Sequence, residues 1–346
     1  NEIIQTLRTI KKKYPFHAIR KIVNDIANLK ILMIGDTILD EYTYVSGLGK
    51  PSKETIVAVQ SEGKDIFPGG IFSTVNNLST FCDNIDFITT CGKEKKYETF
   101  LKKSINKNIK KKYIFKSENQ TIRKIRFIEK NHYTLSKLFE VYEMNDLPIN
   151  KKIENKICRF LNKNLHKYNL VIVNDYGHGL FTKKLIDILC KKSNFLAVNA
   201  QINAGNKGYN LITKYKKASY YCMTLNEAKM AISDKHADTR DVTKQILNLT
   251  KGKYVAITLG SKGSIASARK KSNFIMPAIT NTTVDTMGAG DAYLALSSPV
   301  LYLTKSVELS SLFGNMAGAI QIGSAASKYP LNKLKFLQYF STLMKV

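Results

Sequence analysis

The chain has 346 residues, 44% of them hydrophobic, and a formal net charge of +27. This length is enough for one large α/β domain, or for a core with a smaller appendage. No run approaches the roughly 18–20 apolar residues that a membrane-spanning helix needs, so we expect no membrane contact.

The basic residues are mostly Lys. Only seven of the 54 Lys and Arg residues are Arg, and Lys occurs in almost every segment. Surfaces that read bases or clamp phosphates favour clustered Arg with interleaved aromatic residues. The charge therefore indicates a general preference for Lys plus attraction for an anionic substrate, and we expect no specific nucleic-acid partner.

The cysteines are dispersed singly, without C-x-x-C spacing. They are Cys82, Cys91, Cys158, Cys190 and Cys222. An odd, dispersed set indicates reduced thiols rather than disulfides or a zinc site. The first residues are amphipathic and charged, and no secretory hydrophobic segment follows them. We therefore expect a cytoplasmic protein.

The first half of the chain is predicted to be rich in strands. Residues 1–29 are expected to form one or two helices that act as a connector. The stretch "ILMIGDTILDEY" then indicates a buried strand that runs into a polar turn. The stretches "YTYVSGL" and "TIVAVQSE" alternate partly and could form a small sheet of their own. Further strands are predicted at "NIDFITTCG", "KKKYIFK", "TIRKIRFIEK" and "KLFEVYEMND".

From about residue 150 predicted strands alternate with predicted helices. The strands are "NLVIVNDYG", "FLAVNAQ", "ASYYCMTLN" and "YVAITLG", and a helix begins in "GDAYLALSSPVLYL". Such alternation implies a parallel sheet covered by helices on both faces. Ligands of these sheets bind beyond the carboxyl ends of the strands, where "NDYG", "NAQ", "TLNE" and "TLG" fall.

The stretch "TVDTMGAGDAY" at 283–293 carries the clearest chemistry. Gly288 and Gly290 allow backbone to approach a ligand closely, and the amides around Ala289 would lie at a helix N-terminus, which favours anions. Asp291 is well placed to take a proton from a hydroxyl that attacks a bound phosphate. The alternative is a glycine turn with Asp as a helix cap. No G-x-x-x-x-G-K-[ST] motif occurs, so a P-loop enzyme is not expected.

With Asp285 and Thr286 included, this stretch resembles the signature of the ribokinase-like carbohydrate kinases, the phosphofructokinase-B group. The resemblance runs from about residue 29 to 330 and includes "IGDTILDEY", "PGGIFSTVNNL", "AITLGSKGS" and "GNMAGAIQIG". Within the family, "KLFEVYEMND", "NDYGHG" and "VNAQINAGNKGYN" resemble heptose-phosphate kinase modules fused to a nucleotidyltransferase. The resemblance implies an α/β, ribokinase-like fold with a mostly parallel central sheet, helices on both faces and a small β lid.

The resemblance also implies boundaries and partners. We expect a connector at 1–29, a kinase domain at 30–335 with the β lid at about 42–60 and 108–145, and a tail at 336–346. A homodimer through the lid and a covalently fused N-terminal nucleotidyltransferase domain are the expected partners. The implied reaction is ATP-dependent phosphorylation of a hydroxyl on a sugar or sugar phosphate, with Mg²⁺ held mostly through phosphates and waters.

Individual roles follow from the same resemblance. Asp291 would be the base, and Gly288, Ala289 and Gly290 would supply amides to the transferring phosphoryl group. The residues expected at the substrate are Asp36, Asp40, Gly69, Gly70, Asn76 and Arg123. Those expected at the nucleotide are Asn199, Thr258, Gly260, Gly263 and Asn315. Glu227 would order Mg²⁺ through water.

Some positions depart from the family pattern. The family usually has Asn three residues before the glutamate, where "TLNE" has Thr224, and Ser73 or Thr74 stands at the usual offset of the substrate Asn. An alternating strand also places Arg123 and Arg126 on opposite faces, so both cannot point at one phosphate without a twist or bulge. These departures keep open a catalytically weak or inactive kinase-fold module that binds nucleotide or sugar and regulates a fused nucleotidyltransferase. A nucleoside kinase is a third possibility.

Overall fold

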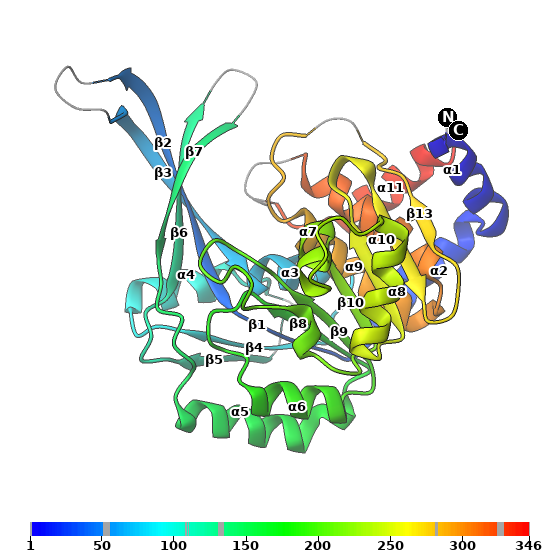
Figure 1. Ribbon diagram of the computed structural model, residues 1–346, viewed down its shortest axis with the longest axis horizontal. Coiled ribbons are helices and arrows are strands. Elements are labelled where there is room, and N and C mark those ends of the chain that lie inside the picture. Colours follow the sequence, from blue (N-terminus) through cyan, green and yellow to red (C-terminus); the bar gives the residue numbers. More distant parts are fainter. Residues whose placement is uncertain are drawn as a thin grey trace.

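Two β-sheets organise the chain (Figure 1). The computed structural model describes residues 2–50, 56–107, 109, 111–130, 135–280, 283–323 and 329–345. Within these ranges the large sheet has nine strands, in the order β13-β12-β11-β10-β9-β8-β1-β4-β5. Its strands are β1 (Ile31–Gly35), β4 (Ile85–Cys91), β5 (Lys111–Lys116), β8 (Leu170–Asp175), β9 (Leu196–Ala200), β10 (Tyr220–Thr224), β11 (Tyr254–Thr258), β12 (Ser264–Ala268) and β13 (Phe274–Met276). The pairs from β5 to β11 are parallel, and β12 and β13 add antiparallel at one edge.

Helices cover both faces of this sheet because its strands are apolar on both sides. In β1, Ile31 and Met33 belong to one buried cluster while Leu32 and Ile34 belong to the other. The helices that line the first cluster are α1 (Glu2–Lys13), α2 (Phe16–Ala27), α3 (Ile71–Leu78), α4 (Lys95–Ser104), α9 (Ala289–Thr304), α10 (Val307–Gln321) and α11 (Lys333–Leu343). Those that line the second are α5 (Lys151–Asn164), α6 (Lys183–Lys192), α7 (Leu225–Ala231) and α8 (Thr239–Thr250).

The smaller sheet, called the lid below, has the strand order β3-β2-β6-β7 in the described residues and projects from the main body (Figure 1). Its strands are β2 (Thr37–Gly49), β3 (Ala58–Gly70), β6 (Ile122–Lys130) and β7 (Leu135–Glu143). The predicted lid range needs two corrections: β3 continues to Gly70, and β5 pairs with β4 in the large sheet. Residues 51–55, 108, 110 and 131–134 of the predicted lid lie outside the described residues.

Both ends of the chain pack into the core. The predicted N-terminal helices form as α1 and α2, and they bury Leu7 and Ile19 in the same cluster as the large sheet. The predicted tail at 336–346 is instead mostly part of α11, because Phe336 and Phe340 recur at helical spacing and are both fully buried. Phe16 at the start of α2 stacks on Phe340 of α11, with ring centroids 6.0 Å apart.

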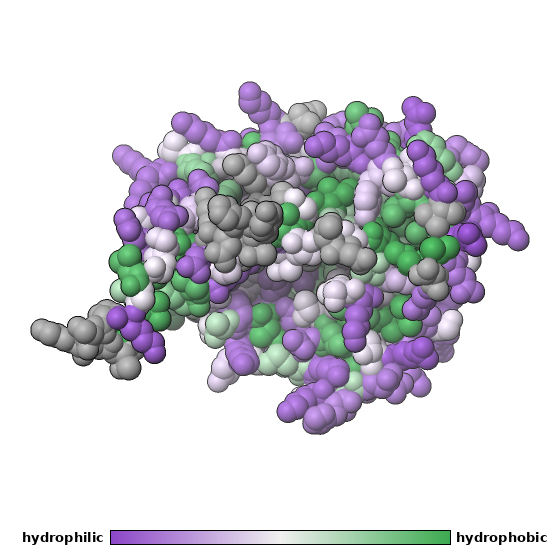
Figure 2. Space-filling view, turned by 90° about the horizontal axis from the view of Figure 1, so that it is seen from above, coloured by the Kyte–Doolittle hydropathy of each residue, from purple (hydrophilic) through white to green (hydrophobic). Residues whose placement is uncertain are grey.

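Hydrophilic and hydrophobic side chains are interspersed on the face drawn in Figure 2. Figure 2 shows hydrophilic side chains around the whole periphery of one face rather than gathered at one place. Among the described helices, none combines the length and the apolar character needed to cross a membrane.

Candidate active site

A cavity of about 600 Å³ lies between the lid and the carboxyl ends of the parallel strands. The lid contributes Ile38, Asp40, Gly70, Lys124 and Arg126, and the segments that follow β8, β9 and β10 contribute Tyr176, Gln201, Ile202, Asn203, Ala204, Lys207, Thr224, Asn226, Glu227 and Met230. The loop before α9 completes the lining with Thr286, Met287, Gly288, Gly290 and Asp291. The motif that sequence singled out therefore opens onto the largest cavity bounded by both sheets.

Asp291 is a buried carboxylate on this cavity. Gly288 adopts φ +75° as the residue before α9, so the chain turns sharply and Asp291 falls in the first helical turn. The phenol of Tyr176 donates a 2.7 Å hydrogen bond to Oδ1 of Asp291, and the side-chain amide of Asn174 lies 3.4 Å from the same oxygen. Burial raises the pKa of Asp291 to about 7. A carboxylate with this pKa can accept and release a proton near neutral pH.

The backbone around Asp291 leaves amide groups for an anion. The amide of Ala289 is 3.4 Å from the carbonyl oxygen of Thr286, whereas no contact among the described residues engages the amides of Gly288 and Gly290. A Cβ built on Gly290 would meet no atom within 4 Å, so open space lies beside this residue. The first N–H groups of a helix carry partial positive charge, which suits a phosphate at this position.

On the lid side of the cavity, Asp40 forms an ion pair with Arg126, which also contacts Glu140 at 2.7 Å. A Cβ on Gly69 would lie 1.9 Å from Oδ2 of Asp40, and Gly70 has φ +59° with its Cβ position 2.4 Å from the carbonyl oxygen of Asp36. The backbone therefore requires glycine at position 70, whereas at position 69 a side chain would displace the carboxylate of Asp40.

Two basic residues of the lid line the cavity, and neither is Arg123, which was predicted to contact the substrate. Lys124 and Arg126 line the cavity, whereas Arg123 faces the other side of β6 and donates to the hydroxyl of Tyr97 at 2.6 Å and to Glu143 at 2.9 Å. The structure places Arg123 away from the cavity because alternation along β6 turns it to the other face, and its contact with substrate stays a prediction. The ammonium of Lys124 is buried beside the Tyr142 ring, 5.0 Å from its centroid, and no ion pair or hydrogen bond to it is found among the described residues. Burial lowers the pKa of Lys124.

Comparison with known proteins agrees with this geometry. The profile of the pfkB family of carbohydrate kinases matches residues 28–334. The chain belongs to this family. Among curated relatives, the "Bifunctional protein HldE" of Aliarcobacter butzleri is 26% identical over 306 residues, which cover 86% of this chain and 61% of the relative. This kinase chain thus spans less than two thirds of the length of that relative.

Solved structures show the same fold. Phosphofructokinase-2 from Escherichia coli, in complex with potassium, superposes with a TM-score of 0.72 at 13% identity and covers 91% of this chain and 99% of its own. The ribokinase of Arabidopsis thaliana, complexed with ribose and ATP, gives a TM-score of 0.68 at 13% identity and covers 92% of this chain and 99% of its own. The predicted ribokinase-like α/β fold is confirmed.

Three residues that were predicted to bind the substrate or the nucleotide do not line the cavity. The side chain of Asn76 donates to the carbonyl of Ser104 at 2.9 Å and accepts from the amide of Asn106 at 3.2 Å. Asp36 accepts from the amide of Tyr176 at 2.8 Å, and Asn199 donates to the carbonyl of Cys222 at 2.9 Å. Each of these side chains bonds a neighbouring element of the fold, and a ligand contact for any of them stays a prediction.

The other four residues that were predicted to bind the nucleotide lie together near the turn between β11 and β12. None of them lines the cavity. Gly260 and Gly263 have φ values of +60° and +93°, and a Cβ on Gly263 would lie 2.0 Å from the carbonyl oxygen of Met276. Asn315 reaches this turn from α10 through a 2.7 Å bond to Ser264, and Thr258 ends β11. The structure thus brings these four residues to one region. Glycine is needed at position 263 because a side chain there would collide with the backbone of Met276.

Glu227 lines the cavity, but its carboxylate is engaged by backbone. Oε2 accepts from the amide of Thr224 at 2.7 Å and Oε1 from that of Ile202 at 3.0 Å, while the Thr224 hydroxyl accepts from the Glu227 amide. Thr224, which stands where the resemblance implies Asn, is the N-cap of α7 in this capping box. The described residues contain no group of three or more His, Cys, Asp or Glu side chains that could hold a metal. In the described part of the chain, protein side chains alone thus do not make up a metal site.

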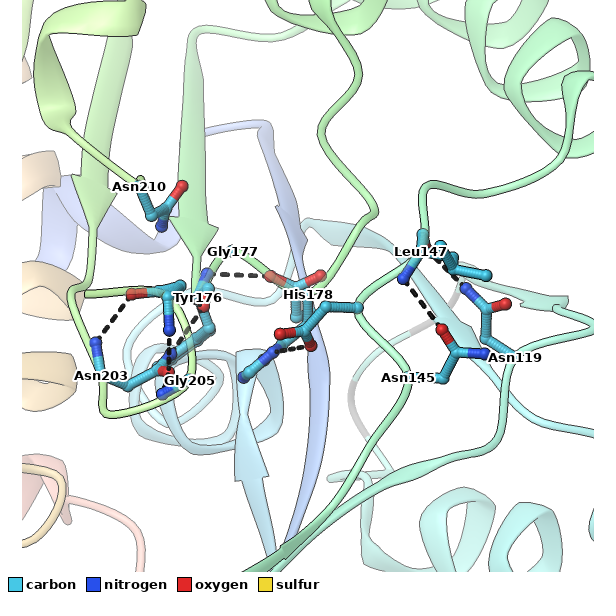
Figure 3. A network of polar contacts seen from close by, with 12 residues as sticks. Asn119, Asn145, Leu147, Tyr176, Gly177, His178, Asn203, Gly205 and Asn210 are labelled. Atoms are coloured by element: carbon cyan, nitrogen blue, oxygen red, sulfur yellow. Dashed lines mark hydrogen bonds and ion pairs between the residues drawn. The ribbon is translucent and has the colours of Figure 1, made fainter. Parts of the chain in front are cut away.

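The sequence placed "NDYG" and "NAQ" at the ligand edge of the sheet but did not single out Tyr176. Tyr176 lines the cavity, and the polar segment "NAQINAGNKGYN" folds back so that Asn203 and Asn206 donate to the Tyr176 carbonyl (Figure 3). His178 is buried and its Nδ1 lies 2.9 Å from Asp146, so it does not reach the cavity. The density of asparagines after a strand was the available signal, since such side chains commonly bond nearby backbone.

Proposed function

We propose that this pfkB-family kinase transfers the γ-phosphoryl group of ATP to a hydroxyl of a sugar or sugar phosphate. The single observation that carries the proposal is the carboxylate of Asp291 on the cavity, one residue from the unengaged amide of Gly290. Phosphoryl transfer needs positioned reactants, a base and stabilisation of the developing negative charge, and this corner of the cavity offers the last two.

The reaction follows from these groups. The acceptor hydroxyl gives its proton to Asp291 as its oxygen bonds to the γ-phosphorus. The bond from that phosphorus to the bridging oxygen of the β-phosphate breaks, and ADP leaves with the electron pair. The amides of Gly288 and Gly290, at the positive end of α9, stabilise the charge on the transferring group. The lid lies over the other wall and excludes water, which would otherwise compete as acceptor.

The proposed cofactors are ATP and Mg²⁺. A relative by fold, the ribokinase of Arabidopsis thaliana, was solved with ribose and ATP, which supports ATP as the donor. Mg²⁺ would neutralise phosphate charge and be held mostly by the phosphates and water. Because both oxygens of Glu227 already accept backbone hydrogen bonds, its expected influence on the ion is indirect.

For the acceptor, we propose a sugar phosphate of the heptose type. The relatives called bifunctional HldE proteins motivate this choice, and the cationic side chains of Lys124, Arg126 and Lys207 on the cavity support an anionic substrate. Arg126 is already paired with Asp40 and Glu140, so Lys124 and Lys207 are the cations left for a phosphate. A fused nucleotidyltransferase domain stays a prediction, and the full reading frame of the gene tests it directly. A cytoplasmic location also stays a prediction, and cell fractionation with an antibody to this chain tests it.

The decisive experiment replaces the proposed base. Asp291→Asn keeps the size of the side chain and its contact with Tyr176, so the protein should fold and bind ATP, while turnover should fall by at least about a thousandfold. A coupled ADP-release assay with ribose, fructose 6-phosphate and a heptose 7-phosphate measures turnover, and calorimetry measures ATP binding.

Two results would argue against the proposal. Unchanged turnover in Asp291→Asn would remove the base. ATP binding without transfer to any acceptor, in the unaltered protein, would instead support the alternative of a kinase-fold module that binds nucleotide without catalysis.

A further inference from the structure

We propose that Tyr176 is a positioning residue for Asp291: its phenol holds Oδ1, so that Oδ2 is the oxygen presented to the acceptor hydroxyl. This inference rests on the proposed role of Asp291 as the base. Both described contacts to the carboxylate, from Tyr176 and from Asn174, end at Oδ1. A carboxylate held through one oxygen cannot rotate freely, which fixes the direction from which a proton arrives.

The backbone of Tyr176 is held on both sides. Its amide donates to Oδ2 of Asp36 at 2.8 Å, and its carbonyl accepts from Asn206 at 2.6 Å and from Asn203 at 2.8 Å (Figure 3). Asp36 is itself fully buried at the end of β1. Three segments far apart in sequence therefore meet at one residue, although its side chain lies on the cavity.

This arrangement accounts for features that the proposed reaction does not use. The asparagine-rich segment after β9 lines the cavity and also supports Tyr176, through Asn203 and Asn206. The next residue, Gly177, has φ +74°, and its Cβ would lie 2.3 Å from the side-chain nitrogen of Asn206, so the chain must be glycine there. The tight turn places the phenol, rather than the backbone, against Asp291.

The phenol also influences the protonation of the base. Burial is the main cause that raises the pKa of Asp291, and the charges of Asp40 on the lid and Glu227 on α7 raise it further. The Tyr176 hydrogen bond and the charge of Lys124 oppose this rise. Cys222 on β10 also interacts with Asp291. Because a donor stabilises the charged carboxylate, removal of the hydroxyl should shift the titration to higher pH.

Tyr176→Phe tests this directly, and the chain offers a matched control. Tyr168 precedes the same strand at its other end, is 3% exposed where Tyr176 is 4%, and donates to Asp86 over the same 2.7 Å. The titration of Asp291 is followed by ¹³C-carboxyl NMR of the free protein, with Asp291→Asn to assign the signal. Tyr176→Phe should raise the midpoint by about one pH unit and Tyr168→Phe should leave it in place.

Kinetics give a second readout. Tyr176→Phe should lower kcat at pH 7 by about fivefold or more, with a smaller loss at pH 9 and little change in KM for the acceptor. A change confined to KM would make Tyr176 a substrate contact and overturn the inference. Equal shifts of the Asp291 titration midpoint in Tyr168→Phe and Tyr176→Phe would mean that Tyr176 only stabilises the fold.

A third variant covers the case in which Tyr176→Phe does not fold. Difluorotyrosine incorporated at position 176 alone keeps the hydroxyl and makes it a stronger donor, so the Asp291 midpoint should move down. An unmoved midpoint would overturn the inference even in a folded protein. If Asp291→Asn keeps full activity while these shifts occur, the proposed function fails but the Tyr176 contact stands.

Discussion

Gly290 has no partner inside the protein that requires it to be glycine. Gly288 and Gly70 have positive φ values, and Gly69 must leave room for Asp40, but Gly290 has an ordinary backbone and no neighbour within 4 Å of its Cβ position. A residue with this freedom at the mouth of a cavity indicates that something outside the chain approaches it. In this kinase the candidate is the transferring phosphoryl group.

Gly290→Ala should therefore separate function from stability. Because Ala is a better helix former, the free energy of unfolding should stay the same or rise by up to about 1 kcal/mol. The added methyl group should exclude the phosphate, and ATP affinity and kcat should each fall at least about tenfold. Thermal melting and calorimetry measure the two effects.

Gly70→Ala provides the contrast. With φ +59° and a carbonyl oxygen 2.4 Å from the new Cβ, this substitution should lower the melting temperature clearly. If Gly290→Ala instead unfolds the protein, or if it binds ATP normally, Gly290 does not face the phosphate.

The sequence placed Asp291 and its glycines together correctly because a local pattern positions them. A glycine turn, an acid and an apolar helix follow one another within about ten residues, so no distant contact is needed to foresee their arrangement. Arg123 and Asn76 do not line the cavity, because their contacts depend on strands and helices far along the chain, and a substrate role for them stays a prediction. Which face of β6 meets the cavity is set by its pairing with β2, and the sequence of either strand alone does not show it.

The lid contacts the glycine loop at Asp285. Lys137 of β7 lies 2.9 Å from Oδ1 of Asp285, and the hydroxyl of Tyr42 on β2 donates to Oδ2 at 2.6 Å. A bulge between Phe127 and Ile128 shifts the register, so that Lys137 pairs opposite the buried Ile128 rather than facing outward. Asp285 also accepts from the amide of Met287, which ties the lid to the loop that precedes Asp291.

Lys137→Met should therefore remove one contact between the lid and the glycine loop without changing the residues that line the cavity. The substitution keeps the aliphatic stem and removes the charge, so we expect KM for the acceptor to rise several-fold and ATP hydrolysis without acceptor to rise relative to transfer. The cost in stability should stay below about 1 kcal/mol, because the ammonium is partly exposed. ADP release with and without acceptor measures the ratio.

Lys64→Met is the matched control for this prediction. Lys64 pairs with the buried Glu41 at 3.3 Å in the same sheet, and neither residue lines the cavity. The control should keep the ratio of hydrolysis to transfer. A similar change in both variants would show that any lid charge has this effect.

At the level of elements, the second half of the chain was predictable and the first half only partly so. After residue 150 each strand and helix has its own apolar pattern, and the connections are short. In the first half, β5 and β6 have similar mixtures of Lys, aromatic and aliphatic residues, yet β5 joins the large sheet and β6 the lid. The choice is made by pairing partners, β4 and β2, which lie about 20 to 90 residues earlier.

Across the whole molecule, the lid has an outer face that the chain itself leaves uncovered. Phe139 stacks on Phe127 with ring centroids 4.4 Å apart, and Phe139 and Val141 are 50% and 42% exposed. The predicted homodimer would bury these side chains against a second copy. Sedimentation equilibrium should then give twice the mass of the chain at micromolar concentration.

Replacing Phe139 and Val141 together with Lys should shift this equilibrium to the monomer. Leu334→Lys, on the exposed side of α11 and away from the lid, should leave it unchanged. A monomeric unaltered protein, or a dimer that survives the double substitution, would contradict the predicted interface.

The open space beside Gly290 has a practical consequence for observing the enzyme. The five native thiols are free, and all but Cys190 are buried, with burial raising the pKa of Cys82 and Cys91 to about 11. A cysteine introduced at 290 would therefore be the most reactive one, and a fluorescent maleimide attached there would sit under the lid. Because the probe would fill the space proposed for the phosphate, its brightness would report the surroundings of the empty cavity rather than turnover, in a protein that has no tryptophan to provide a native signal.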